Sequence, residues 1–263
     1  MGERKRLGEW SSLRVPQLLL AALLVGLCLL SVGAGAVSFT AARADAPAPT
    51  LVRDDETVVT RVGGAVVERR GDLTPAPVDG VTIVQVSVTA CGDRSAGSAV
   101  LVDDDLLLTS AHVVGDAGLV RIDHRGSVLT GEVLGVLADG RDLALIEIKA
   151  SMLGPLPAGT IPEVGEAITV VGHPGGGPRT VVVGPRVGVV PLARHLTMGE
   201  LVAVDASTPP GVSGGPALDV DGNLIGILVA TEIASDTGII VIVDDPANLA
   251  ESPLVAGTCP ARA

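Results

Sequence analysis

The stretch Gly211-Val212-Ser213-Gly214-Gly215-Pro216 is the most informative part of this 263-residue sequence. It places one serine between small residues, after an apolar run that ends at Val204. Glycine lets the backbone turn sharply and approach a bound group closely. The backbone N–H groups of Gly211 and Ser213 can then point at one position and stabilise an oxyanion there. The stretch therefore predicts a nucleophilic serine, which needs a base and a group that orients the base.

The positions of the histidines decide between two ways of using such a serine. In α/β-hydrolases, the acid and the histidine follow the serine of the Gly-x-Ser-x-Gly motif. The four histidines of this chain, at positions 112, 124, 173 and 195, all precede Ser213, which excludes that arrangement. The order His, Asp, Ser remains, in which one of these histidines would be the base and an aspartate would orient it.

Three motifs in this order resemble those of the trypsin-like serine proteases. Leu108–Val114 resembles the segment that carries their catalytic histidine, Arg141–Ile146 resembles their aspartate strand, and Gly211–Pro216 resembles their nucleophile loop. Two further segments support the resemblance, Val170–Gly176 and Asp219–Ile227. The resemblance covers roughly residues 80–260 and is closest to the bacterial HtrA-like and MarP-like branch, in a form without a PDZ domain.

The resemblance implies a role for each member of this set. Ser213 would attack the scissile carbonyl, His112 would take and return the proton, and Asp142 would orient the imidazole. Asp139 and Asp123 are nearby alternatives, and only the Leu-Ala-Leu sequence after the aspartate favours Asp142.

One position departs from the family pattern. The residue before the serine is usually Asp or Asn in these proteases, and here it is Val212. An apolar side chain removes a polar contact that could hold the loop in place. The sequence therefore leaves open whether the oxyanion hole, formed by the N–H groups of Gly211 and Ser213, is preformed.

The resemblance also places the substrate pocket. In related proteases its floor lies just before the oxyanion loop, which here corresponds to Ala206-Ser207-Thr208. This triplet contains no acid, which argues against a requirement for Lys or Arg before the scissile bond. We expect small or medium apolar residues there, with Thr231–Thr237 as another wall of the pocket.

From Gly80 onward, short β-runs are separated by turn residues at regular spacing, and no long amphipathic helix pattern occurs. The sequence predicts an all-β fold of two six-stranded antiparallel barrels, the first over about residues 80–150 and the second over about 163–245. The strands expected in the first barrel are Val81–Thr89, Gly97–Val102, Leu106–Thr109, Leu119–His124, Ser127–Leu137 and Leu143–Ile148. Those expected in the second are Ala167–Gly172, Thr180–Val190, Leu201–Ala206, Pro216–Asp219, Leu224–Val229 and Gly238–Val243. Asp245–Ala250 is expected to form a short helix.

The N-terminal region has the features of an export signal. Residues 1–17 are polar and partly basic, and Leu18–Phe39 contains no charge. A membrane-spanning helix needs about 20 apolar residues, and the basic flank predicts that the N-terminus stays inside and the domain lies outside the cytoplasm. A cleaved signal peptide, with cleavage near Ala34-Gly35-Ala36 or Ala42-Arg43-Ala44, is the alternative, and it would make the protein secreted. Residues 40–79 are expected to form a linker, in which Val58–Val67 could pair as a strand at the domain edge.

Composition sets further limits. The net charge of −12 argues against nucleic acid as a partner of the folded part. Trp10 and Phe39 are the only aromatic residues and both precede the domain, so Val, Leu, Ile and Ala must fill its core.

The three cysteines suggest one covalent brace. Cys28 lies in the apolar N-terminal segment, whereas Cys91 and Cys259 lie near the start and the end of the domain. MarP-like proteases carry a disulfide at comparable places, so the resemblance implies a bridge between Cys91 and Cys259, with two free thiols as the alternative. Neither the cysteines nor the histidines have zinc-site spacing, and Asp219–Asn223 lacks the final glutamate of a calcium loop. No metal or cofactor is expected.

Together these features predict an exported serine endopeptidase, tethered to the membrane, that acts on envelope or secreted proteins. The alternative is a catalytically silent trypsin fold that serves as a binding or sensing module, which Val212 and the lack of aromatic residues in the domain would favour. His124 and His195 carry no motif and are expected to be surface residues. His173, in a Gly/Pro loop, is also expected to be exposed, with a place in the lining of the cleft as the alternative.

Overall fold

The computed structural model describes residues 57–62, 65–70, 72–150, 152, 154–188 and 200–259. They all lie within one compact unit, Asp54–Ala263. Within these residues, no helix is both long and apolar enough to cross a membrane. The N-terminal tail, the apolar segment Leu18–Phe39 with Cys28, and His195 lie outside the described residues.

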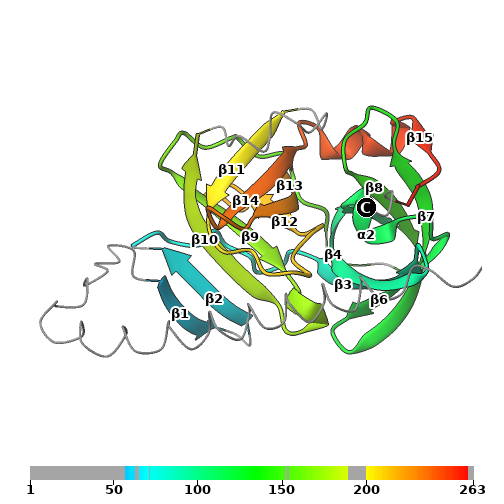
Figure 1. Ribbon diagram of the computed structural model, residues 1–263, viewed down its shortest axis with the longest axis horizontal. Helices are drawn as coiled ribbons and strands as arrows, with labels where there is room; N and C mark the ends of the chain where they lie inside the picture. The colour runs from blue at the N-terminus through cyan, green and yellow to red at the C-terminus, as the bar shows by residue number, and fades with distance from the viewer. Residues whose placement is uncertain are drawn as a thin grey trace, which may run out of the picture. The chain divides into compact units, whose positions relative to one another are not determined.

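Barrel 1 is a closed antiparallel sheet in the order β6-β3-β4-β5-β8-β7, with β7 paired again with β6 (Figure 1). Its strands are β3 (Ile83–Ala90), β4 (Asp93–Asp103), β5 (Leu106–Thr109), β6 (Leu119–His124), β7 (Ser127–Leu137) and β8 (Ala144–Ile148). A short strand near the C-terminus, β15 (Leu254–Val255), adds to β7. The sequence predicted the bounds of β5, β6 and β7 as the structure has them.

Barrel 2 closes in the order β10-β11-β14-β13-β12-β9, with β9 paired again with β10. Its strands are β9 (Ala167–Gly172), β10 (Thr180–Val187), β11 (Leu201–Asp205), β12 (Pro216–Leu218), β13 (Leu224–Glu232) and β14 (Thr237–Ile242). The predicted all-β fold of two six-stranded antiparallel barrels is therefore confirmed. The expected terminal helix is a 3₁₀ helix, η3 (Pro246–Glu251).

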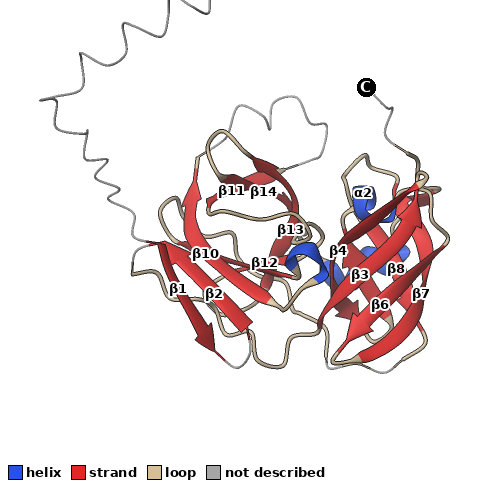
Figure 2. Cartoon of the chain, turned by 60° about the horizontal axis from the view of Figure 1, so that its bottom comes forward, coloured by secondary structure: helices blue, strands red, loops and turns tan. Residues whose placement is uncertain are grey.

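A two-stranded hairpin precedes the barrels, in the part of the expected linker where Val58–Val67 was expected to pair as a strand at the domain edge. We call β1 (Thr57–Val62) and β2 (Ala65–Arg70) the N-terminal hairpin. β2 pairs in parallel with the start of β10, so the hairpin extends the sheet of barrel 2 (Figure 2). The folded region therefore begins upstream of residue 80.

Aliphatic side chains fill the core, as the absence of aromatic residues after Phe39 requires. One cluster fills barrel 1 and a second fills barrel 2. A third contains buried residues of both, such as Val100 and Leu108 of barrel 1 with Val171 and Ile239 of barrel 2. Burying such a side chain contributes about 1.5–3 kcal/mol. The barrels are thus joined by an apolar interface, which fixes the elements that carry the site.

Candidate active site

His112 lies on the four-residue helix α2 (Ala111–Val114), between β5 and β6. Val113 and Val114 are buried and hold the helix against barrel 1, whereas the His112 side chain is 42% exposed. Its Nδ1 lies 2.6 Å from Oδ2 of Asp142, and its backbone N–H donates to Oδ1 of the same carboxylate at 2.8 Å. With Nδ1 engaged by the carboxylate, Nε2 is the nitrogen that can accept a proton.

Asp142 is the acid that contacts His112, among the three that the sequence offered. Asp139 accepts a hydrogen bond from Nε of Arg141 at 2.8 Å, and Asp123 accepts two from Arg121 at 2.9 and 2.7 Å. Because Asp142 stands just before β8, which pairs with β5, its carboxylate reaches the start of α2.

The serine loop, which we define as Pro209–Gly215, is packed tightly against barrel 1. Gly214 has φ +84°, and a Cβ there would lie 2.1 Å from the carbonyl oxygen of Ser98, so only glycine fits without rearrangement. Ser98 in turn donates its backbone N–H to the carbonyl of Ser213 at 2.8 Å. The position of Ser213 therefore depends on β4 of the other barrel.

One carbonyl group links the serine loop to the segment that leads to His112. The carbonyl of Leu228, on β13, accepts a hydrogen bond from the N–H of Gly214 at 2.8 Å and another from the Ser110 hydroxyl at 3.0 Å. Ser110 is buried and lies two residues before His112. Ser213 and His112 thus lie at one junction between the barrels, although no hydrogen bond joins the Ser213 hydroxyl to His112 within the described residues.

The backbone of the serine loop leaves two amide groups available. The carbonyl of Pro210 accepts the N–H of Gly175 at 2.9 Å, and all peptide bonds of the described residues are trans. The N–H of Gly211 in the same peptide therefore points the opposite way. In the part of the chain that the structure describes, neither this N–H nor that of Ser213 donates to a backbone carbonyl. Both can donate to an oxyanion.

Val212 anchors the loop by burial. Its side chain has no exposed surface and belongs to the apolar cluster of barrel 2. A Cβ on Gly172 of β9 would lie 2.9 Å from the Val212 Cα, so the two backbones pack closely. Where related proteases have a polar residue, this chain holds the loop through an apolar contact.

The expected floor segment of the pocket, Ala206–Thr208, and the wall segment, Thr231–Thr237, are joined by hydrogen bonds. The hydroxyls of Thr208 and Thr231 lie 2.5 Å apart, and the Thr231 hydroxyl also lies 2.9 Å from the Thr208 carbonyl. Ala206 and Thr208 are buried, whereas Ser207 is exposed.

Acidic groups lie beside this floor, although the triplet itself contains none. A cavity of about 30 Å³ is lined by Ala206, Ser207, Asp236 of the wall segment, and Glu68 and Arg70 of the N-terminal hairpin. The triplet alone gives no sign of these acidic groups, because they come from other segments of the chain. No local signal connects residues 68 and 70 with a pocket more than a hundred positions later.

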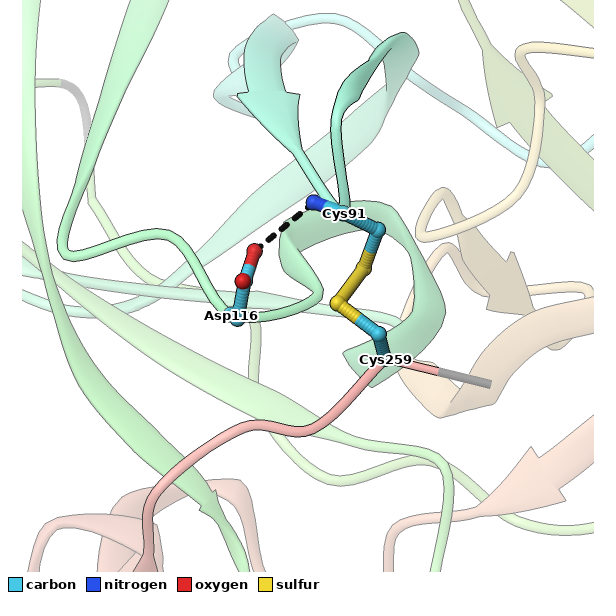
Figure 3. Close-up of side chains that lie close together, drawn as sticks. All are labelled: Cys91, Asp116 and Cys259. Carbon is cyan, nitrogen blue, oxygen red and sulfur yellow. Dashed lines mark hydrogen bonds between the residues drawn. A yellow bond between two sulfur atoms is a disulfide. The ribbon is translucent and has the colours of Figure 1, made fainter. Parts of the chain in front are cut away.

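Cys91 and Cys259 form a disulfide, with their Cα atoms 5.4 Å apart (Figure 3). The N–H of Cys91 donates to Oδ1 of Asp116 at 2.8 Å, and Asp116 follows α2 by two residues. The bridge therefore ties the C-terminal segment to the turn after His112. Among the described residues, the one group of three potential metal ligands is this same set, and both of its sulfur atoms are used by the disulfide.

Two histidines expected at the surface are half-buried. The Nε2 atom of His173 is buried and has no hydrogen-bond partner among the described residues, while its Nδ1 lies 3.1 Å from the Gly177 carbonyl oxygen. His124 is also half-buried. Burial, reinforced by Arg125 and His173, lowers the pKa of His124 from its usual value of 6.5. Both histidines are therefore only partly exposed, because packing across the two barrels is not encoded in local polarity.

A wider groove of about 720 Å³ lies on barrel 1, where it is lined by residues of β3, β4, β6 and β7. Arg121 contributes to its lining, but His112, Asp142, Ser213 and the pocket segments do not. Its size alone does not make it the reactive site, because its lining offers hydroxyls and arginines but no nucleophile with a base.

Comparison with known proteins agrees with this geometry. Residues 97–227 match the family model of the trypsin-like peptidase domain. The chain is 33% identical over 241 residues to the putative serine protease HhoA of Synechocystis, covering 84% of this chain and 57% of HhoA. It is 34% identical over 151 residues to a probable periplasmic serine endoprotease DegP-like of Chlamydia muridarum, covering 56% of this chain and 30% of that protein. The chain thus spans only part of the length of these relatives.

Solved structures show the same fold. The active form of the Rv3671c protease from M. tuberculosis has a TM-score of 0.59 and 20% identity, covering 76% of this chain and 96% of that one. The HtrA-type protease AlgW, with a bound tripeptide, has a TM-score of 0.56 and 27% identity, covering 64% and 57%. This chain therefore carries a trypsin-like peptidase domain related to the HtrA-like serine proteases.

Proposed function

We propose that this chain is a serine endopeptidase whose catalytic triad is His112, Asp142 and Ser213. The observation that carries the proposal is the pairing of His112 with Asp142 at the junction that also fixes the serine loop. Nε2 of His112 takes the proton of the Ser213 hydroxyl as its oxygen attacks the scissile carbonyl. Asp142 stabilises the imidazolium that forms.

The N–H groups of Gly211 and Ser213 stabilise the oxyanion of the tetrahedral intermediate. When this intermediate collapses, the C–N bond breaks and His112 returns the proton to the leaving amine. Water then hydrolyses the acyl-enzyme by the same steps, with His112 again as the base. A hydrogen bond between the Ser213 hydroxyl and Nε2 of His112 then forms in the substrate complex, since such contacts often tighten only there.

The substrates we propose are envelope or secreted proteins. A relative of 34% identity is named a periplasmic endoprotease, and Leu18–Phe39 has the length and composition of a membrane-spanning helix. We place the domain outside the cytoplasm, tethered by that segment, or secreted if the segment is cleaved. Cell fractionation together with the mass of the mature chain separates these two cases.

Labelling with a fluorophosphonate tests the proposed activity, because this reagent reacts with an activated serine. The full-length protein should label stoichiometrically, and Ser213→Ala should not label at all. Ser127→Ala is the matched control, since Ser127 is an exposed hydroxyl at the start of β7, and it should label like the wild type. A folded wild-type protein that does not label would contradict the proposal and favour a binding module with a trypsin fold.

A further inference from the structure

Arg70, the last residue of the N-terminal hairpin, bridges two parts of barrel 2. Its NH1 lies 2.7 Å from Oδ1 of Asp205, and its NH2 lies 3.0 Å from Oδ2 of Asp236. The Arg70 side chain is only 22% exposed. The planar guanidinium offers donors in a fixed fork, which suits it to hold two carboxylates at one separation.

The two carboxylates belong to the two sides of the candidate substrate pocket. Asp205 ends β11 and directly precedes the floor segment. Asp236 lies in the turn between β13 and β14, within the wall segment. Arg70 therefore contacts the wall segment and the residue directly before the floor segment.

Asp236 has a backbone that needs support. Its φ is +55°, in the left-handed region that residues other than glycine seldom occupy. Its side chain is 48% exposed, and the contact with Arg70 is the ion pair that the structure gives it. Without the guanidinium, this turn would keep only the contacts among its own residues, such as the hydrogen bond from the Thr237 hydroxyl to the Ser235 carbonyl.

The floor segment is continuous with the oxyanion loop. Thr208 is followed directly by Pro209, whose carbonyl accepts the N–H of Val212 at 3.2 Å. Only two residues separate Thr208 from Gly211. A displacement of the floor would therefore reach the amide groups that we assign to the oxyanion.

We propose that Arg70 is a positioning residue for the substrate pocket and the oxyanion loop. By clamping Asp205 and Asp236, it holds the floor and wall segments in the arrangement that accepts a substrate. The N-terminal hairpin is thus a functional part of the enzyme and not a linker. This proposal rests on the proposed protease function, but the clamp itself can be tested without catalysis.

The test uses the full-length protein and the variants Arg70→Gln, Arg70→Lys and Arg121→Gln. Arg121 forms two hydrogen bonds with Asp123 on barrel 1. Arg121→Gln therefore removes an arginine–carboxylate interaction that lies away from the candidate pocket. Hydrogen–deuterium exchange of residues 206–212 and 231–237 reports the order of the pocket. The rate of fluorophosphonate labelling reports its readiness for reaction.

In Arg70→Gln, exchange in both segments should be faster, and labelling should be about fivefold slower, as expected for the loss of two partly exposed ion pairs. Arg70→Lys should lie between this variant and the wild type, because lysine keeps the charge but not the fork. Arg121→Gln should match the wild type in both measurements. Unchanged exchange and labelling in Arg70→Gln, or equal effects in Arg121→Gln, would overturn the proposal.

Two further outcomes keep the test decisive. If the wild type does not label but Arg70→Gln exchanges faster in the two segments, the proposed activity fails and the clamp stands. If Arg70→Gln does not fold, Asp236→Asn removes one arm of the clamp at an exposed turn. It should accelerate exchange in 231–237, and unchanged exchange there would overturn the proposal.

Discussion

The His112 side chain is oriented by hydrogen bonds near the surface of barrel 1, whereas the residue next to Ser213 is buried in the core of barrel 2. Asp142 makes two contacts with His112, which is 42% exposed. Val212, next to the serine, has no exposed surface. A polar contact selects the tautomer and charge of a side chain, whereas apolar burial fixes the position of a backbone. Mutation of the polar contact between Asp142 and His112 should therefore lower the reactivity of Ser213. Mutation of the buried Val212 should instead lower the stability of the fold.

The largest effect is expected for Asp142→Asn, which removes the carboxylate that contacts His112. The amide cannot stabilise the imidazolium and permits the wrong tautomer, so labelling of Ser213 should fall by about 10⁴-fold. The melting temperature should change little, because the contact lies near the surface. Asp139→Asn, which affects only the pair with Arg141, should label normally. Equal losses in the two variants would mean that Asp142 has no special role.

The next largest effect should follow removal of the disulfide that braces the His112 side. Cys91 and Cys259 are 168 positions apart, and the loss of a native disulfide typically costs about 2–5 kcal/mol. The double variant Cys91→Ser/Cys259→Ser should show this decrease in the free energy of unfolding, measured in urea. The reduced wild type should show the same decrease. A double variant as stable as the oxidised wild type would show that hydrogen bonds such as that of Asp116 are sufficient.

Val212→Ala tests how much the burial of Val212 in the core of barrel 2 contributes. Deleting two buried methyl groups in a packed core should cost about 2 kcal/mol, from lost burial and the remaining cavity. Labelling of the folded fraction should fall much less than in Asp142→Asn, because no reacting group is changed. Val220→Ala is the control at a side chain 58% exposed, and it should change stability by less than about 0.5 kcal/mol. If Val212→Ala is as stable as the wild type, burial of Val212 does not hold the serine loop, and the contrast drawn between the two barrels is wrong.

The smallest effect concerns His124 on β6, whose pKa His173 of barrel 2 helps to lower. The lowered pKa of His124 means that the unfolded chain takes up the proton more readily than the folded protein. The resulting destabilisation of the folded protein is absent well above the unfolded pKa of about 6.5. The free energy of unfolding therefore falls as the pH drops below that value. His124→Gln should flatten this part of the stability curve, followed by urea unfolding between pH 7 and pH 5. Arg125→Gln, which removes one of the causes, should flatten it less. An unchanged slope in His124→Gln would show that other groups dominate.

Much of the fold could be predicted from local patterns. Apolar runs between turn residues predicted β5, β6, β7 and β9 with the observed bounds. The apolar residues of Val58–Val67 predicted a strand at the domain edge, but the neighbouring segments rich in proline and charge indicated a linker and gave no sign of a two-stranded hairpin. Its second strand pairs with β10, more than a hundred residues later, and such a pairing leaves no local signature.

Some features of the candidate site could likewise be predicted from the sequence, and others could not. The sequence by itself determined the all-β fold, the order of a histidine, an aspartate and a serine, and the glycines around Ser213, because these depend on the chemistry of short segments. Only the tertiary structure decided which aspartate contacts His112, how Val212 holds its loop, and that Arg70 bridges Asp205 and Asp236. The last contact joins residues 166 positions apart. Hydrogen bonds, ion pairs and burial depend on distances in space, and these are fixed only when the two barrels and the hairpin pack together.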